Sequence, residues 1–336
     1  MTNSPMDPRP NAKKDRIDSL AATAGASATA VKDVQIDTAG AVKDTGGVSL
    51  IASAFAPLRR NPVFLFGATI TLLFVLLALF APWIAPHDPA MRIPALLDRQ
   101  TAAAKIVEAI PGHALGSDDF GRDLLSRLIV GARQTLIVGV FATLFGLVGG
   151  LVLGTLAGAF GGWVDSLVMR MVDVMLSIPS LLLAVSISAL APKPSQWTVI
   201  IAIATVQVPV FARLLRGSML AQRSSDHVLA ARALGVKQSA IVFRHMLPNS
   251  LGPVIVQSTL VLATSIIDAA ALSFLGLGNP DDRQPEWGQM LGAAQQYISD
   301  DPHLAFYPAA CIIVVALGFT LMGESLREAL DPKSRR

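Results

Sequence analysis

The chain has 336 residues, of which 52% are hydrophobic and only 15% are charged. A soluble globular domain carries about 25% charged residues, so this composition excludes an ordinary water-soluble domain. The formal net charge of +3 comes from scattered basic residues without interleaved aromatics, which argues against a nucleic-acid partner. The single cysteine, Cys311, excludes an intrachain disulfide and a cysteine-rich metal or iron–sulfur site.

The apolar residues are concentrated in six stretches that contain no Asp, Glu, Lys, Arg or His. A helix needs about 20 apolar residues to cross a hydrocarbon core about 30 Å thick, and each stretch has about that length or more. The sequence therefore predicts an all-α integral membrane protein with six transmembrane helices. The six stretches are residues 61–86, 134–164, 174–192, 194–212, 246–267 and 304–323.

The first predicted span covers about residues 62–85 and ends in a proline-rich turn. A long extramembrane stretch follows, residues 86–133, in which Ser117 is expected to cap an amphipathic helix over 124–133. The second span is predicted over about 134–160.

Prolines mark the next two predicted spans. Pro179 interrupts the third, 166–190, and Pro209 lies within the fourth, 196–215, and both are expected to kink their helices. The last two predicted spans are residues 251–275 and a helix that ends near Gly323.

Composition divides the chain into four parts. The first 50 residues contain no aromatic residue and no sustained helical periodicity, which is typical of a disordered tail. The predicted parts are a disordered cytoplasmic tail (1–50), a first transmembrane helix with an extracytoplasmic segment (51–130), a core transmembrane domain (131–324) that includes a cytoplasmic loop (216–249), and a cytoplasmic tail (325–336).

The distribution of basic residues predicts that both termini are cytoplasmic. With that orientation the inner segments hold 18 Lys and Arg residues and the outer segments hold 8, and Arg170 lies within a span. Loops on the cytoplasmic side carry the excess of Lys and Arg in membrane proteins. The inner loop over 213–244 shows the bias most clearly, with six basic residues and one acidic residue, Asp226.

Four glycines recur every four residues in the second predicted span: Gly146, Gly150, Gly154 and Gly158. Residues four apart lie on one face of a helix, and small residues on that face let helix backbones approach closely in a membrane. The pattern predicts a helix-packing face, which either another helix of this chain or a second subunit would satisfy.

The cytoplasmic loop has the features of two short helices joined by a turn. Ser225 is expected to cap a helix whose first turn carries Asp226, and Gly235 fits the left-handed position that ends it. Ser239 is expected to start a second short helix, which Pro248 separates from the fifth span. On these features alone, a basic loop that contacts lipid headgroups is the alternative.

The same loop resembles the cytoplasmic signature of permease subunits in binding-protein-dependent ABC importers, written E-A-A, three residues, G, nine residues, I-x-L-P. Leu229 stands where the signature has Glu, and His245 stands where it has Ile. The residues that match, with the spacing intact, are Ala230, Ala231, Gly235, Leu247 and Pro248.

Four flanking segments are similar to the peptide/nickel branch of these importers, in its second or C-type permease subunit. The likeness covers about residues 55–333. The segments read HALGSDDFGRDLLSR from His113, RHMLPN from Arg244, ALSFLGLG from Ala271 and LREALDP from Leu326.

The resemblance implies the fold of type I ABC importer permeases, in the cytoplasmic (inner) membrane, and a coupling helix that docks into a cleft of a separate ATPase. Ala230 and Ala231 would let the backbone of that partner approach closely. The residues expected at the contact are Asp226, Leu229, Ala230, Ala231, Arg232, Gly235, His245, Leu247 and Pro248.

The resemblance also implies the partners and the cargo: a second permease subunit in a heterodimer, two ABC ATPase subunits and an extracytoplasmic solute-binding protein. Short peptides are the expected substrate, with nickel or glutathione as alternatives within the branch. The chain has no P-loop, because none of its eight lysines follows a glycine, so ATP-Mg is expected on the partner subunits and no cofactor on this chain.

Charged residues near the predicted spans provide further candidates. Asp268, well inside the fifth span, either lies on the translocation path or is hydrogen-bonded to a neighbouring helix. Arg170 and Asp173 are three residues apart, which predicts a local ion pair. The acidic loop around Glu286 and Trp287, which also contains Asp281 and Asp282, would face an incoming partner or be solvated.

No catalytic residue and no metal site are predicted. The five histidines show no paired metal-ligand spacing, and neither HExxH nor GxSxG occurs, so an intramembrane enzyme is disfavoured. A cation-coupled secondary transporter, the alternative from another class, predicts more charge within the spans and often repeated halves. The sequence favours a non-catalytic permease subunit.

Overall fold

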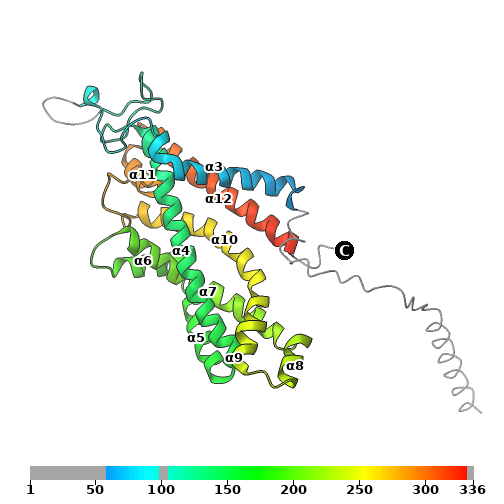
Figure 1. The fold of residues 1–336 in the computed structure, drawn as a ribbon. Coiled ribbons are helices and arrows are strands. Elements are labelled where there is room, and N and C mark those ends of the chain that lie inside the picture. The colour runs from blue at the N-terminus through cyan, green and yellow to red at the C-terminus, as the bar shows by residue number, and fades with distance from the viewer. Residues whose placement is uncertain (1–57, 98–104, 331–336) are drawn as a thin grey trace, which may run out of the picture. The chain divides into compact units, whose positions relative to one another are not determined.

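The computed structural model describes residues 58–97 and 105–330. Within these ranges the chain forms helices joined by loops, and the only paired extended residues are three isolated bridges. The described part of the chain thus confirms the predicted all-α fold (Figure 1). The predicted tail over 1–50 and the last residues of the predicted C-terminal tail, 331–336, lie outside the described residues.

The first predicted span is helix α3, Pro62–Ile84. The Asn61 side chain caps it by accepting hydrogen bonds from the backbone N–H groups of Val63 and Phe64, at 2.9 and 3.3 Å. Proline at the first helical position removes an N–H group that would otherwise lack a partner. Helix α3 packs along the last helix, α12, which runs from His303 to Leu330.

Helix α4 runs from Leu124 to Phe160 without a break. The prediction of a separate amphipathic helix over 124–133 that precedes a span over 134–160 is therefore wrong. No proline separates the two parts, so the backbone hydrogen bonds continue through the junction. The first turns of α4 carry polar residues that pack against charged loop residues, as Arg127 does against Asp118.

The N-cap of α4 is Asp123 and not Ser117. The Asp123 carboxylate accepts a hydrogen bond from the backbone N–H of Ser126 at 2.8 Å. The Ser117 hydroxyl is buried and instead donates to the carbonyl of Lys105 at 3.0 Å, while it accepts from the Val107 N–H at 3.2 Å. Ser117 therefore holds the α3–α4 segment (residues 85–123) together rather than starting a helix.

The third predicted span is two helices, α5 (Gly162–Ser177) and α6 (Ser180–Ala189), which meet at an angle of 95°. Ile178 is extended, at φ −91° and ψ 131°, as expected for a residue that precedes proline. The break at Pro179 is confirmed, and it is a sharper bend than a kink. The described residues hold five helices long and apolar enough to span a membrane, and a sixth if this pair counts as one span.

Helix α7, Gln196–Gln222, starts where the fourth span was predicted and continues past Leu215, with Pro209 inside it. Helix α8, Asp226–Ala233, lies in the predicted loop over 216–249 and follows α7 after a short turn. Both are helices because their apolar and small residues recur at helical spacing and no proline other than Pro209 interrupts them.

The second half of the predicted loop over 216–249 is helical and continues into the fifth span without a break. A short helix, α9 (Gln238–Ala240), passes into a π-helix, η2 (Ile241–Met246), which continues directly into α10 (Leu247–Phe274). The prediction that Pro248 separates these helices is wrong, because Pro248 lies at the start of α10 and the helical backbone continues on both sides of it. The predicted start at Ser239 is displaced as well, since α9 begins at Gln238.

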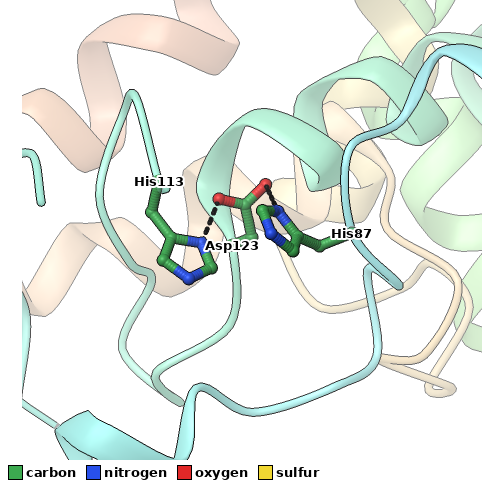
Figure 2. Close-up of side chains that lie close together, drawn as sticks. All are labelled: His87, His113 and Asp123. Carbon is green, nitrogen blue, oxygen red and sulfur yellow. Dashed lines mark hydrogen bonds and ion pairs between the residues drawn. The ribbon is translucent and has the colours of Figure 1, made fainter. Parts of the chain in front are cut away.

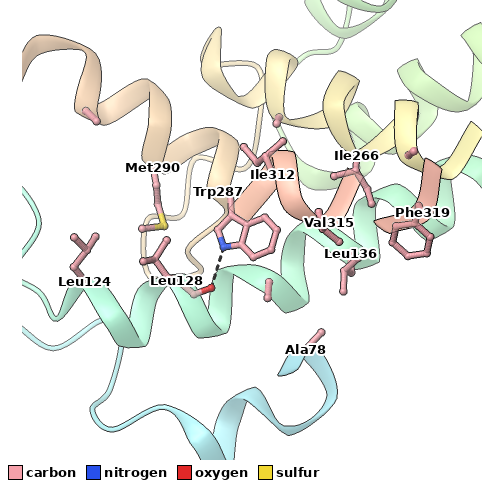
Figure 3. Close-up of a cluster of buried hydrophobic side chains, with 14 of the residues drawn as sticks. Ala78, Leu124, Leu128, Leu136, Ile266, Trp287, Met290, Ile312, Val315 and Phe319 are labelled. Carbon is pink, nitrogen blue, oxygen red and sulfur yellow. Dashed lines mark hydrogen bonds between the residues drawn. The ribbon is translucent and has the colours of Figure 1, made fainter. Parts of the chain in front are cut away.

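A buried cluster joins α3, α4, α10, α12 and the short helix α11, Trp287–Ala294 (Figure 3). Trp287 is fully buried at its centre, and its indole Nε1 donates to the carbonyl of Leu128 in α4 at 2.9 Å. Its ring also meets Phe74 of α3 edge-to-face at 5.6 Å. A tryptophan with its N–H satisfied can be buried without a polar penalty, so it anchors α11 between the spans.

The glycine face of α4 packs against α7 within this chain. A Cβ atom at Gly150 would lie 2.3 Å from the Cβ of Phe211, and one at Gly154 would lie 2.9 Å from the Cβ of Leu215. Carbon atoms do not approach that closely, so only glycine fits. The same close approach holds for the other two glycines, Gly146 against Gln207 and Gly158 against Met219.

We predict that Gly150→Ala destabilises the protein by about 1–3 kcal/mol, since an added methyl group would force α4 and α7 apart. The midpoint of thermal unfolding in detergent measures this change. Gly217→Ala on α7 is the matched control, because a Cβ there meets nothing within 4 Å, and it should be neutral or slightly stabilising. Equal midpoints for the two variants would contradict the packing described here.

Candidate functional site

Helix α8 presents one exposed face to solvent. Asp226, Ala230 and Arg232 are exposed, and Leu229 keeps 48% of its surface. Asp226 lies in the first turn of the helix and Arg232 in the last, where the helix dipole favours a negative and a positive charge, respectively. Four of the residues expected at the ATPase contact therefore lie on the accessible side of one short helix.

The turn after α8 has the predicted geometry. Gly235 has φ +73°, in the left-handed region, and its N–H donates to the carbonyl of Arg232 at 2.9 Å. Leu234, just before it, is 84% exposed. The ABC signature does not include Leu234, and sequence reasoning missed it; its position directly before the helix-ending glycine was the available signal.

The opposite side of α8 is buried inside the chain. Val228 is fully buried and Ala231 is 6% exposed. The expectation that a partner backbone approaches Ala231 is therefore wrong, because that methyl group packs inward, and Ala230 is the small residue on the exposed face. Helix α8 contacts η2, and Val228 and Ala231 belong to a buried cluster that continues from there into α7 and α10. Its other members include Phe211, Leu215 and Met219 of α7, Ile241, Val242 and Met246 of η2, and Val254 and Val261 of α10.

Polar side chains also tie the start of α8 to the start of α10. The Asn249 side-chain amide lies 3.3 Å from Nε2 of His227 and donates to the carbonyl of His245 at 2.7 Å. The Ser225 hydroxyl donates to the Gln222 carbonyl at 2.6 Å and so does not cap α8 as predicted, although Ser225 occupies the N-cap position. His227 and Asn249 were not recognised from the sequence, since they are 22 residues apart.

The second half of the signature lies at the junction of η2 and α10. His245 and Leu247 are half-buried, and Pro248 is exposed. π-helical turns are rare and are frequent at functional sites. Ile241, Val242 and Met246 of this π-helix are buried and belong to the cluster beneath α8.

Two ion pairs join α5 to the second half of α7, the half that leads to α8. Arg216 forms a bidentate pair with Asp165, with both distances at 2.6 Å. Arg213 pairs with Asp173 at 2.5 Å. The predicted pair between Arg170 and Asp173 is therefore wrong, because the partner comes from the neighbouring helix and not from the next turn.

Asp268 lies half-buried in α10. Within the described residues its carboxylate has no hydrogen-bond or ion-pair partner, so the expected bond to a neighbouring helix is not found. An ionisable group inside a span is costly in lipid and faces protein or a water-filled cavity in nearly all cases. The geometry thus leaves Asp268 free to face a second subunit or an aqueous path.

At the other ends of the spans, buried charges lock the α3–α4 segment to the α10–α11 loop (residues 275–286). Asp118 accepts from Arg122 at 2.7 Å and lies 3.1 Å from Nε of Arg127, and all three side chains are buried. Both arginines also donate to the backbone carbonyl of Asp282, at 3.1 and 3.0 Å. Buried charges are tolerated because each is paired and hydrogen-bonded.

A cavity of about 230 Å³ opens beside this cluster. Burial, followed by the negative charge of Asp118, raises the pKa of the Asp119 carboxyl. The cavity combines these charges with an apolar wall, so it can accept a small polar group. Its lining includes Asp118, Asp119, Arg122, Arg127, Gln289 and Met290.

The acidic α10–α11 loop is not simply an exposed partner surface. Asp281 and Asp282 are exposed, but Glu286 is 6% exposed and Trp287 is fully buried. Burial raises the pKa of Glu286 to about 7, although hydrogen bonds from Ser273 and from the Gly288 N–H lower it in part. Its Oε1 atom has no partner among the described residues, as suits a carboxyl group that keeps its proton.

We predict that Glu286 makes stability depend on pH. Because the folded-state pKa is raised from 4.5 to about 7, stability falls as pH rises through this range, by up to about 3 kcal/mol, and stays low above it. Glu286→Gln, which cannot ionise, should remove most of the fall in the midpoint of thermal unfolding between pH 5 and pH 8. Glu108 is exposed, so Glu108→Gln is the control and should keep the wild-type fall in the midpoint. An undiminished fall in Glu286→Gln would refute the assignment of this pH dependence to Glu286.

Comparisons with known proteins agree with this architecture. Residues 150–336 match the family described as binding-protein-dependent transport system inner membrane component. Residues 49–102 match the N-terminal transmembrane domain of oligopeptide transport permease C.

Several characterised relatives are similar over most of their length. The dipeptide transport system permease protein DppC of Alkalihalophilus pseudofirmus is 42% identical over 86% of this chain and 91% of that protein. The probable D,D-dipeptide permease DdpC of Escherichia coli is 40% identical over 82% and 90%. The glutathione permease GsiD of Pectobacterium atrosepticum is 37% identical over 82% and 88%.

A solved structure of the MetNI methionine ABC transporter in an inward-facing conformation has a similar fold, with a TM-score of 0.51 at 21% identity, over 61% of this chain and 96% of that chain. The chain therefore belongs to the family of binding-protein-dependent transport system inner membrane components, the multi-pass permeases of ABC importers. Within that family it is a C-type permease of the peptide-importer branch.

Proposed function

We propose that this chain forms half of the translocation path for short peptides, in a heterodimer with a second permease subunit. The relatives support the choice of cargo, because their names specify dipeptides, di- and tripeptides, D,D-dipeptides and glutathione, all of which are short peptides or peptide-like. The half-exposed Asp268 supports a shared path, since its carboxylate requires water or a partner subunit beside it.

The coupling to ATP is assigned to α8. In this proposal two ABC ATPase subunits bind ATP-Mg, and this chain carries out no chemical step. One ATPase receives the exposed face of α8, with Asp226, Leu229, Ala230, Arg232 and the turn at Gly235. The observation that carries the assignment is that the two sides of α8 differ. One side exposes apolar residues, and the other is buried in a cluster that α8 shares with α7, η2 and α10.

The remaining signature residues lie next to α8 in the proposed arrangement and not on its exposed face. His245, Leu247 and Pro248 lie where η2 becomes α10, so a displacement of α8 reaches the span through them. Ala231 contributes from inside the cluster, and not at the partner surface.

The proposed orientation places both termini and α8 on the cytoplasmic side of the inner membrane. The α3–α4 segment and the α10–α11 loop then face outward, towards an extracytoplasmic solute-binding protein. The proposed functional division remains a core over 131–324 with a preceding unit over 51–130, although Trp287 and Arg127 show how closely the two pack.

Two other functions are compatible with parts of the molecule. A nickel or glutathione importer of the same branch would use the same fold and coupling helix. A cation-coupled secondary transporter would depend on Asp268 and would need no contact at α8.

We predict that Leu234→Asp abolishes association with the co-expressed ATPase. Burial of a leucine side chain contributes about 1.5–3 kcal/mol, so a charge in its place should lower the amount of co-purified ATPase by about tenfold or more. Leu190→Asp is the matched control, because Leu190 is 85% exposed but lies at the far end of α6, and Leu234 is 84% exposed. Equal ATPase recovery from both variants would exclude α8 as the docking helix.

Uptake assays with the same preparations identify the substrate. Reconstituted with the second permease, the ATPases and the binding protein, the wild-type complex should take up labelled dipeptide only with ATP, and unlabelled di- and tripeptides should compete while Ni²⁺ does not. Leu234→Asp should show no uptake. Uptake that follows a cation gradient without ATP would favour the secondary transporter.

A further inference from the structure

Two histidines and an aspartate from three separate points of the chain meet beside the start of α4 (Figure 2). His87 follows the end of α3, His113 belongs to the middle of the α3–α4 segment, and Asp123 is the N-cap of α4. Their positions are 26 and 10 residues apart in sequence, so no metal-binding motif is visible in the sequence. The fold alone brings them together.

The potential ligand atoms of these side chains lie within 4.8 Å of one another. Nδ1 of His113 is 2.8 Å from one carboxylate oxygen of Asp123, and Nδ1 of His87 is 3.7 Å from the other. The two imidazole rings lie 4.4 Å apart between centroids and are inclined by 32°. Both rings therefore present nitrogen atoms to the same carboxylate from different directions, as Figure 2 shows.

Neighbouring groups hold the carboxylate in place. Asp123 is 2% exposed, and its second oxygen accepts the N–H of Ser126 at 2.8 Å. The Ser126 hydroxyl in turn accepts the backbone N–H of His87 at 3.0 Å. Hydrogen-bonded supports of this kind orient the ligands of metal sites and fix their direction. They also show that His87 is kept near Asp123 by its backbone, and not only by its ring.

The three side chains differ in exposure in a way that permits entry of an ion. The His87 side chain is 41% exposed and that of His113 is 15% exposed, while the carboxylate lies at the bottom. Solvent therefore reaches the site past the His87 ring. An ion bound there would keep at least one position open to water.

We propose that His87, His113 and Asp123 form a binding site for a divalent transition-metal ion of the zinc class. Imidazole nitrogens suit zinc and its neighbours, and one carboxylate with two imidazoles is a known three-ligand set for zinc with a water in the fourth position. Mg²⁺ and Ca²⁺ are disfavoured, because they prefer oxygen ligands throughout. The bound ion would join the end of α3, the α3–α4 segment and the start of α4.

Binding requires the side chains to draw closer together. Tetrahedral zinc with ligand distances of about 2.0–2.1 Å puts its ligand atoms about 3.4 Å apart, so the separations here, which are all within 4.8 Å, must shorten by up to about 1.4 Å. Rotation of the exposed His87 ring can do this without moving a helix. The helix N-terminus disfavours a cation, but the buried Asp123 carboxylate lies between the ion and the helix and offsets that effect.

Zinc binding to the full chain, purified with its partner subunits and without a polyhistidine tag, tests the proposal directly. Isothermal titration with Zn²⁺ should show one site per chain, and Co²⁺ in its place should give the visible absorption of a nitrogen- and oxygen-ligated ion. His87→Gln should lower the Zn²⁺ affinity by about tenfold or more and bleach the Co²⁺ spectrum. Mg²⁺ should not compete.

Two controls distinguish loss of this Zn²⁺ site from loss of structure and from nonspecific Zn²⁺ binding elsewhere on the protein. His87→Gln should keep the wild-type unfolding midpoint without metal, because its side chain is 41% exposed. Asp123→Asn should also lower the Zn²⁺ affinity, while its amide oxygen can still accept the Ser126 N–H that caps α4. His303→Gln, which removes a histidine outside this group, should bind Zn²⁺ as the wild type does. No Zn²⁺ binding by the wild type, or binding that His87→Gln leaves unchanged, overturns the proposal.

Discussion

Three side chains on one face of α7 hold together the part of the described structure that carries α8. Phe211, Leu215 and Met219 recur every four residues, and each meets a glycine of α4 at a distance that admits no side chain. The same three side chains belong to the buried cluster beneath α8. In a membrane, lipid is as apolar as the helices, so close packing rather than exclusion of water keeps α4 and α7 together. Any force on α8 is therefore applied to helices that cannot separate without losing this packing.

The second element of this arrangement is the unbroken passage from η2 into α10. Because Pro248 lies in the first turn of α10 and not between two helices, the segment from Gln238 to Phe274 can move as one rod. Asn249 and His227 fasten α8 to the start of that rod. Together, the cluster and the rod give a physical route by which a displacement of α8 at the proposed ATPase contact would reach α7 and α10, and the ion pairs of Asp165 and Asp173 join α5 to α7.

The sequence alone predicted the spans, the break at Pro179 and the left-handed turn at Gly235, because these features depend on local composition and on the backbone conformations that proline and glycine favour. It was also sufficient for the family, through the spacing of the cytoplasmic signature. It was insufficient wherever a distant segment decides the outcome. Ala231 points inward because η2 covers it, and Trp287 is buried because it packs in a cluster formed by α3, α4, α10 and α12. The group of His87, His113 and Asp123 exists only after the α3–α4 segment folds back on α4, and no spacing rule could reveal it.

The central claim is that α8 and the start of α10 move as one body during transport. Cysteines in the double variant His227→Cys/Asn249→Cys, in a Cys311→Ser background, can be joined by a short, reducible thiol cross-linker, because the native side chains reach to within 3.3 Å of each other. ATP-driven peptide uptake by the reconstituted complex should be the same after cross-linking and after reduction of the linker. Loss of uptake on cross-linking, with recovery on reduction, would show that α8 must move relative to α10 and would contradict this account.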